Sequence, residues 1–428
     1  MKKKFVFSGI VVIFCYLLTA CAGPSPSAKP VTITFYKRGY IEGGTDTTSV
    51  TNAKAIEVFQ KNHPNITVKI VGIPWTLEGT AQLEAALADG TDINVFSIDH
   101  PNLAYYARQG KLSNLEPYLT EEDRADFYAS GLQAVTVDGK ISAWPIWVVT
   151  VGIYANTDLF EERGVALPTL DNPWSWDEFV AAAQKLTFKR ANGTQVYGFS
   201  VSSLPGEMAW QPFWYIDGGR VLSPDGRRFV QNTPEGLSAL QKAADLALVY
   251  NVTPPDFGNV TKATVHDQFK QGAVAMMMDS PGFITDLERE NFPFTILPPP
   301  VGELGKVVTA GFFGMYGVYN TSDPDKLKAA HELARYLTGS QVAQDVPNYQ
   351  QSPGLRRSNT AYATSPNRAI MAQLVGYVVY EPPANVSPDL INTYELTMQS
   401  ILLGKKTPQQ AMDEIAPLYQ QELDATSQ

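Results

Sequence analysis

The chain contains very little cysteine and histidine. Of its 428 residues, two are cysteines and four are histidines, and the histidines lie far apart. No histidine falls in a metal-ligand spacing or in a recognisable catalytic triad, so we expect no metal site and no cofactor. The GxxxxGK[ST] loop that cradles nucleotide phosphates is also absent, which argues against a nucleotide-driven motor. No signature of catalysis is visible in the sequence.

The chain also lacks an excess of positive charge. It carries 33 Lys and Arg against 43 Asp and Glu, a formal net charge of -10 at pH 7. A chain that binds nucleic acid through its phosphates needs a basic patch or stripe, and no basic run occurs here. We therefore expect no nucleic-acid partner. Net charge by itself does not specify a ligand.

The N-terminus carries the pattern of an export signal. Three lysines follow Met1, then an apolar segment runs over 5–20 and ends in Leu17-Leu18-Thr19-Ala20-Cys21. A basic start, a short apolar core and small residues before a cleavage point are typical of a signal peptide. The segment supplies 16 positions, fewer than the roughly 20 apolar residues that cross a bilayer. We therefore predict a cleaved signal over 1–20 rather than a membrane anchor.

Cleavage before Cys21 has consequences for the rest of the chain. Cys15 leaves with the signal, so the exported part has no pair of thiols for a disulfide. Residues 21–30 are small and rich in proline, which predicts a flexible tether. The remaining length is too great for one ordinary hydrophobic core, so we expect two domains.

The apolar pattern after the tether predicts alternating strands and helices. Strands are expected over 31–36, 66–70 and 93–98, and helices over 53–62 and 77–89. This order indicates βαβ units and a parallel sheet covered by helices. Later, Ser175 and Glu178 form a capping box, with Trp174 placed to pack on Phe179. Further helix starts are predicted at Thr233 and near Asp323, and a strand over 273–278.

Several segments, taken in order, resemble those of the family 1 extracellular solute-binding proteins of ABC importers, which include maltose and oligosaccharide binders. Each segment alone is a weak signal, but their number, order and spacing cover nearly all of the chain after Cys21. The cysteine after Leu-Thr-Ala resembles a lipoprotein signal in addition. The segments lie at 59–66, 92–99, 138–146, 153–160, 173–179, 271–277, 311–314 and 329–337.

The resemblance implies an α/β fold of the periplasmic-binding-protein type II class, with two lobes, a hinge of several crossings and a ligand cleft between the lobes. It places the first lobe at 31–145 plus 303–349 and the second at 146–302 plus 350–428. It further implies that the protein is not an enzyme. A monomer, attached to the membrane by a lipid on Cys21, would deliver a carbohydrate by hinge closure to a permease with a separate ATPase. The location would be the outer face of the membrane, or the periplasm in a two-membrane bacterium.

Candidate ligand residues come first from the strand ends, because open α/β sheets bind ligands beyond the carboxyl ends of their strands. Any one of these exposed positions could equally be ordinary solvated surface. Convergence of several loops favours a site. These positions are Lys37, Arg38, Tyr40, Trp75, Asp99, His100, Asp279 and Ser280.

A second group of candidates rests on aromatic and charged side chains near expected crossings. Tryptophan rings offer flat apolar faces that sugars can stack on. Trp75, Trp147 and Trp210 are therefore expected at the cleft, whereas core packing explains Trp144, Trp174 and Trp214. Glu207 and Arg356 match positions that the resembling family places near its ligand. Phe312 and Phe313 lie between two glycines that permit close approach, and core packing is an alternative for one of them.

Three other functions remain open from the sequence. Lys37, Arg38 and Arg356 leave room for a charged ligand such as glycerol phosphate, or the protein could bind a polyamine. A secreted glycoside hydrolase would need two facing carboxylates, which 43 acidic residues cannot exclude. The same fold could instead present a ligand to a sensor kinase.

Overall fold

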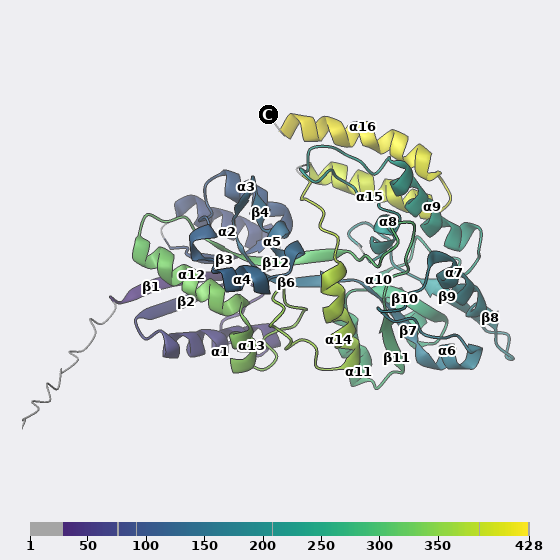
Figure 1. The fold of residues 1–428 in the computed structure, drawn as a ribbon, viewed down its shortest axis with the longest axis horizontal. Coiled ribbons are helices and arrows are strands. Elements are labelled where there is room, and N and C mark those ends of the chain that lie inside the picture. The colour runs from purple at the N-terminus through teal and green to yellow at the C-terminus, as the bar shows by residue number, and fades with distance from the viewer. Residues whose placement is uncertain (1–28, 75–76, 91, 208, 385, 427–428) are drawn as a thin grey trace, which may run out of the picture.

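The computed structural model describes residues 29–426 except 75–76, 91, 208 and 385. The predicted signal and most of the tether, including Cys21, lie outside the described residues, as does Trp75. Figure 1 shows two α/β lobes side by side, with β6 (Trp144–Thr150) and β12 (Gly311–Val318) running between them. The two-lobed α/β architecture expected from the sequence is confirmed.

The first lobe is built on a five-stranded mixed sheet in the order β2-β1-β3-β12-β6. Strands β1 (Val31–Arg38), β2 (Ile66–Ile73) and β3 (Val95–Asp99) are parallel, as predicted, whereas β12 is antiparallel to β3 and β6. Its helices are α1 (Thr47–Asn62), α2 (Leu77–Asp89), α3 (Leu103–Arg108), α4 (Glu121–Asp126), α5 (Ala129–Ala134), α12 (Pro324–Thr338) and α13 (Ser340–Asp345). A small hairpin pairs β4 (Thr136–Val137) with β5 (Lys140–Ile141).

The second lobe is built on a sheet in the order β11-β7-β10-β9-β8. Its strands are β7 (Gly152–Asn156), β8 (Phe188–Lys189), β9 (Gln195–Ser200), β10 (Val274–Asp279) and β11 (Phe294–Leu297). Its helices are α6 (Thr157–Arg163), α7 (Trp176–Lys185), α8 (Pro212–Tyr215), α9 (Pro234–Leu248), α10 (Lys262–Lys270), α11 (Ile284–Arg289), α14 (Pro366–Gln373), α15 (Pro388–Leu402) and α16 (Pro408–Thr426). Short 3₁₀ turns are η1 (His100–Asn102) and η2 (Glu116–Tyr118) in the first lobe, and η3 (Pro281–Phe283) and η4 (Leu374–Tyr377) beside the second.

Each lobe has its own hydrophobic core. One buried cluster joins β1, β3 and β12 to the helices of the first lobe, and two others fill the second lobe. Leu355 and Val375 belong to the first cluster, although the sequence places everything from residue 350 in the second lobe. The reason is that residues 353–355 run along β6, where Val148 donates its backbone N–H to Pro353 O at 3.0 Å and Leu355 donates to Ile146 O at 3.2 Å. The chain therefore leaves the first lobe later than predicted.

The crossings between the lobes are hydrogen-bonded to one another through Thr309, which is fully buried. Its hydroxyl donates to Val151 O at 2.6 Å, just after β6. Its backbone N–H donates to Tyr377 O at 3.0 Å, and its carbonyl accepts from the N–H of Val379 at 2.8 Å. One residue thus joins the β6–β7 crossing, the approach to β12 and the segment after η4. Among the described residues, no helix is both long and apolar enough to cross a membrane.

Candidate functional site

The end of β1 supplies two cations to the edge of the first sheet. Lys37 and Arg38 form its last two residues rather than following it, because β1 is two residues longer than predicted. Arg38 is buried, and its guanidinium donates to Pro74 O at 3.3 Å and to the Thr80 hydroxyl at 3.1 Å. The Lys37 ammonium donates to Arg38 O at 3.1 Å, and burial lowers the pKa of Lys37 to about 8. Arg38 therefore holds the loop after β2 in place. The Lys37 ammonium becomes neutral at a lower pH than an ordinary lysine does.

Phe312 and Phe313 point to opposite faces of the first sheet, because successive strand residues alternate. Phe313 is 3% exposed and packs near Tyr380, with ring centroids 6.1 Å apart. Phe312 is 38% exposed. The structure thus assigns core packing to Phe313 and leaves the Phe312 ring available on the other face. An exposed aromatic ring at this edge can stack on an apolar face of a ligand.

His100 follows β3 and faces the same side as Phe313. Its ring lies 5.7 Å from that of Phe313 and 5.5 Å from that of Tyr380. Among the described residues, its Nε2 is buried without a hydrogen-bond partner. Burial lowers the pKa of His100 to about 4, so the ring is neutral at pH 7.

In the second lobe, Asp279 ends β10 opposite Gly152, the first residue of β7. Its carboxylate is 2.7 Å from the Lys262 ammonium and 2.6 Å from His266 Nε2. Burial alone would raise the pKa of Asp279, but the hydrogen bond from His266 and the charge of Lys262 outweigh it, so the pKa lies below its ordinary value. Asp279 is therefore enclosed by its partners, and the group left toward solvent is Lys262, whose side chain is 38% exposed.

Ser280 and the surrounding rings complete this cluster. The backbone carbonyl of Ser280 accepts a hydrogen bond from the Tyr154 hydroxyl at 2.5 Å, and its own hydroxyl lies 3.4 Å from the Lys262 ammonium. His266 stacks on Phe283 with ring centroids 3.6 Å apart. The predicted pair of Asp279 and Ser280 is thus held in a rigid polar cluster at the hinge end of the second sheet.

The other predicted residues lie in varied surroundings. Trp147 is half-buried in β6 and covers Gly314, where an added Cβ would lie 2.2 Å from the indole. Trp210 is 3% exposed and packs against Trp214 with ring centroids 4.9 Å apart, in the core of the second lobe rather than in an exposed loop. Tyr40 and Glu207 are half-buried in turns after β1 and β9. The backbone of Asp99 ends β3, while its side chain lies outside what the structure describes.

Arg356 occupies a closed internal site in the first lobe. Its guanidinium contacts Asp123 at 2.9 Å and Asp126 at 3.4 Å, and it donates to Thr338 O at 3.1 Å. It also lies over the Phe127 ring, 4.0 Å from the centroid. These contacts use its charge to hold α4, α12 and the residue 353–356 segment together.

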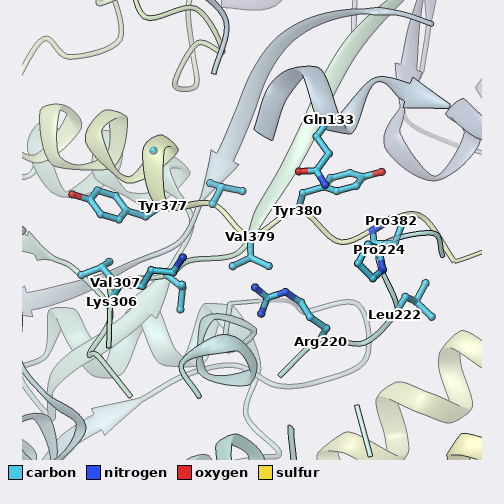
Figure 2. Close-up of a pocket in the computed structure, with 13 residues that line it drawn as sticks. Gln133, Arg220, Leu222, Pro224, Lys306, Val307, Tyr377, Val379, Tyr380 and Pro382 are labelled. Carbon is cyan, nitrogen blue, oxygen red and sulfur yellow. The ribbon is translucent and has the colours of Figure 1, made fainter. Parts of the chain in front are cut away.

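A cavity of about 340 Å³ lies between the lobes. Figure 2 shows side chains from both lobes and from the crossings around it. None of the predicted site residues that the structure describes lines it. Its lining residues are Gln133, Arg220, Leu222, Pro224, Lys306–Val308, Gly376–Tyr380 and Pro382.

Tyr380 and Glu381 at this hinge were not predicted from the sequence. Glu381 accepts the backbone N–H groups of Val221 and Leu222 at 3.1 and 3.3 Å. Burial raises the pKa of Glu381 to about 7. The string Tyr380-Glu381-Pro382-Pro383 carries no motif beyond a proline pair, and only the fold brings it against both lobes.

Two α/β lobes, joined by hydrogen-bonded crossings and carrying polar and aromatic side chains at their facing strand ends, define a two-lobed binding protein. The family model for bacterial extracellular solute-binding proteins matches residues 44–344. The chain therefore belongs to that family, as the resemblance of its segments predicted. This is a family of binding proteins.

Individual relatives agree with this assignment. A binding protein of Brucella abortus is 25% identical over 372 residues, which cover 84% of this chain and 86% of that protein. The fold is similar to that of an ABC substrate-binding protein of Listeria monocytogenes in complex with cycloalternan, with TM-score 0.68, 21% identity and coverage of 93% and 99%. It is also similar to the cyclic alpha-maltosyl-1,6-maltose binding protein of Arthrobacter globiformis, with TM-score 0.78, 18% identity and coverage of 92% and 100%.

Proposed function

We propose that this protein captures a carbohydrate between its lobes and delivers it to the permease of an ABC importer. The observation that carries the proposal is Phe312, an aromatic ring 38% exposed at the hinge-side edge of the first sheet. A sugar stacks on such a ring through its CH face, while its hydroxyls need hydrogen-bonding groups nearby. Lys37 at the end of β1, Lys262 at the start of α10 and Ser280 directly after β10 carry such groups. Two similar folds are named for carbohydrate ligands.

Delivery requires the two lobes to move relative to each other. A ligand held by both lobes favours the closed arrangement, and the changed outer surface tells a permease that the protein is loaded. Solution scattering with and without maltose tests this step. We expect a smaller radius of gyration at saturating maltose, and an unchanged profile would refute closure.

Ligand binding itself is tested by thermal unfolding with maltose, maltotetraose and cycloalternan. A ligand that binds only the folded state raises the apparent stability by RT ln(1 + [L]/Kd), about 2.7 kcal/mol at 100 Kd. A rise in Tm with at least one of these sugars, confirmed by calorimetry, supports the proposal. No binding across a wider panel of mono- and oligosaccharides would overturn it.

A charged metabolite is the second candidate, and Lys262 favours it. The Lys262 ammonium is paired with Asp279 at 2.7 Å, but its side chain is 38% exposed whereas that of Asp279 is 4% exposed, so the cation is the member of the pair that faces solvent. Titration with glycerol 3-phosphate and with spermidine separates the two proposals. Binding of glycerol 3-phosphate without binding of any neutral sugar would replace the carbohydrate with a phosphorylated ligand.

We further propose that the protein is a monomer held at the outer face of the membrane by a lipid on Cys21. The support is the signal-like sequence before that cysteine and the proline-rich tether after it. One acyl chain anchors only marginally, so stable attachment needs more than one chain. Replacing Cys21 with alanine is expected to move the protein from the membrane fraction to the soluble fraction. Retention of the variant in the membrane would show that another feature anchors it.

A further inference from the structure

We infer that the cavity between the lobes is a second binding site, for a small molecule that carries a carboxylate or phosphate group, separate from the proposed carbohydrate site. The cavity is lined from the first lobe by Gln133, from the second lobe by Arg220 and Leu222, and from the crossings by Lys306 and Tyr377. In Figure 2, the Arg220 and Lys306 side chains converge on the cavity near Val379. Two cations from different segments thus line the same space.

The cavity lies on the opposite face of the first sheet from Phe312. Gly311 and Phe313 share a face of β12, and an added Cβ at Gly311 would meet Val378 at 2.6 Å and Val148 at 2.7 Å. Val378 lines the cavity, and so does Tyr380, which packs near Phe313. Phe312 is the alternate residue and points away from this face. A ligand stacked on Phe312 therefore leaves the cavity accessible to a second molecule.

Among the described residues, neither cation that lines the cavity forms an ion pair with a carboxylate. Arg220 is half-buried and Lys306 is exposed, whereas the partly buried Lys242 is 2.7 Å from Asp217. The Arg220 guanidinium donates to Gly219 O at 2.5 Å and lies 5.5 Å from the Tyr215 ring centroid. These contacts orient it without neutralising it. Arginine presents a planar fork that matches carboxylate and phosphate oxygens, and lysine adds a point charge.

The Glu381 carboxylate, whose pKa the Arg220 charge lowers, does not cancel this positive charge. Glu381 lies in the chain between the lining residues Tyr380 and Pro382 but does not line the cavity itself. Its two oxygens accept the backbone N–H groups of Val221 and Leu222. Burial raises its pKa to about 7, despite the opposing charge of Arg220, so the group is only partly ionised at neutral pH. An anion from solution can therefore gain the interaction with Arg220 and Lys306.

The remaining walls limit the size and character of the ligand. A volume of about 340 Å³ is at the lower end for small-molecule sites. Val307, Val379 and Leu222 form apolar walls, while Gln133 can donate hydrogen bonds. The site thus suits a compact organic acid or a phosphorylated metabolite rather than an extended oligosaccharide.

The test is calorimetric titration of the purified protein, free of carbohydrate, with potassium phosphate and separately with succinate, at constant ionic strength set with potassium chloride. We expect saturable binding of at least one probe. Arg220→Gln and Lys306→Gln should each weaken it by about tenfold, because each removes a charge-assisted contact. Matched controls are Arg228→Gln, an exposed arginine of the same loop, and Lys189→Gln, an exposed lysine of β8. Both controls should bind like the wild type.

Several outcomes would overturn the inference. These are no binding of either probe to the wild type, equal weakening by the control variants, and unchanged affinity in both cavity variants. If Arg220→Gln fails to fold by circular dichroism, the exposed Lys306→Gln decides alone. Repeating the titration with saturating maltose tests separateness, and competitive displacement would assign the anion to the carbohydrate site. Because the first titration needs no sugar, its result stands whether or not a carbohydrate binds.

Discussion

Tyr380 and Glu381 are neighbours in the chain, yet their side chains bind opposite lobes. The Tyr380 ring lies 5.5 Å from the ring of His100 in the first lobe. The Glu381 carboxylate accepts N–H groups from Val221 and Leu222 in the second. An extended segment sends successive side chains to opposite sides, so one short stretch can contact both lobes. Any change in lobe arrangement must therefore alter the contacts of at least one of these residues.

The raised pKa of Glu381 predicts that the free energy of unfolding depends on pH. Burial raises its pKa from 4.5 to about 7 in the folded protein. Below pH 4.5 the carboxyl is protonated in both states, and the group contributes no difference. Between pH 4.5 and 7 the unfolded chain releases the proton first, so the folded state loses up to about 3 kcal/mol relative to it. Above pH 7 this cost stays constant.

Replacing Glu381 with glutamine removes the titration while keeping an acceptor for one of the two N–H groups. The free energy of unfolding, measured in urea at pH 4.5, 6, 7 and 8, is compared between variant and wild type. Contributions from other groups cancel in the difference. We expect the variant to gain stability relative to the wild type as pH rises from 4.5 to 7. A constant difference over this range would contradict the raised pKa of Glu381.

The second prediction concerns Thr309, whose hydrogen bonds join the segments that cross between the lobes. Removing its hydroxyl should lower the free energy of unfolding. Thr309→Val keeps the shape of the side chain but removes the hydroxyl that binds the backbone of Val151. Leaving buried backbone groups without this partner costs about 1–3 kcal/mol of unfolding free energy. Thr338→Val is the matched control, because its similarly buried hydroxyl donates to Ala334 O and Arg335 O, both within its own helix α12. Equal losses for the two variants in urea unfolding would argue against a special role of Thr309.

The elements that the sequence predicted well are those with local signals. The capping box of Ser175 and Glu178 is present, and Trp174 lies 6.5 Å from Phe179, as expected for a staple. These residues are within five positions of one another, so the pattern alone defines their geometry. By contrast, α1 begins at Thr47, six residues before its predicted start. Its first turns are polar and lack an apolar stripe, and the cap, Asp46, is followed by no hydrophobic repeat.

The candidate site was less predictable because its charges are paired over long distances. The strand-end rule identified Asp279 and Arg38, but it cannot show that Lys262 and His266 enclose the first or that Thr80 binds the second. These partners lie 13 to 42 residues away along the chain. Only the folded arrangement tells an internal ion pair from a charge offered to ligand.

Replacing Arg356 should lower the stability of the protein and leave its affinity for ligand unchanged. Arg356→Gln removes one of the two arginine partners of Asp123, which is 4% exposed and keeps Arg335 at 2.7 Å. Removing one member of a buried ion pair costs about 3–5 kcal/mol, and the retained Arg335 places the expected loss at the lower end of that range. Arg357→Gln is the control, since Arg357 is exposed and its guanidinium lies over the Tyr128 ring, 4.4 Å from the centroid, with no ion pair among the described residues. Urea unfolding measures the stability of both variants. Reduced sugar affinity of folded Arg356→Gln with unchanged stability would return this residue to the ligand site.

Alanine variants of the adjacent residues Phe312 and Phe313 test whether the carbohydrate stacks on the Phe312 ring. Phe312→Ala removes a ring that is 38% exposed, so the free energy of unfolding should fall by about 1–2 kcal/mol, less than for the buried Phe313. Carbohydrate affinity should fall about tenfold, in line with an aromatic contact of about 0.5–1.5 kcal/mol beyond the area it buries.

Phe313→Ala removes a ring that is 3% exposed and should cost about 3–5 kcal/mol of stability. Because this ring faces away from the proposed sugar, affinity measured under conditions where the variant remains folded should stay within about twofold of the wild type. Calorimetry at several temperatures below each Tm separates the two effects. The opposite pattern, with affinity lost only in Phe313→Ala, would mean that the carbohydrate binds on the cavity face of the sheet. The proposed carbohydrate site on the Phe312 face would then be wrong, and the cavity would no longer be a separate site.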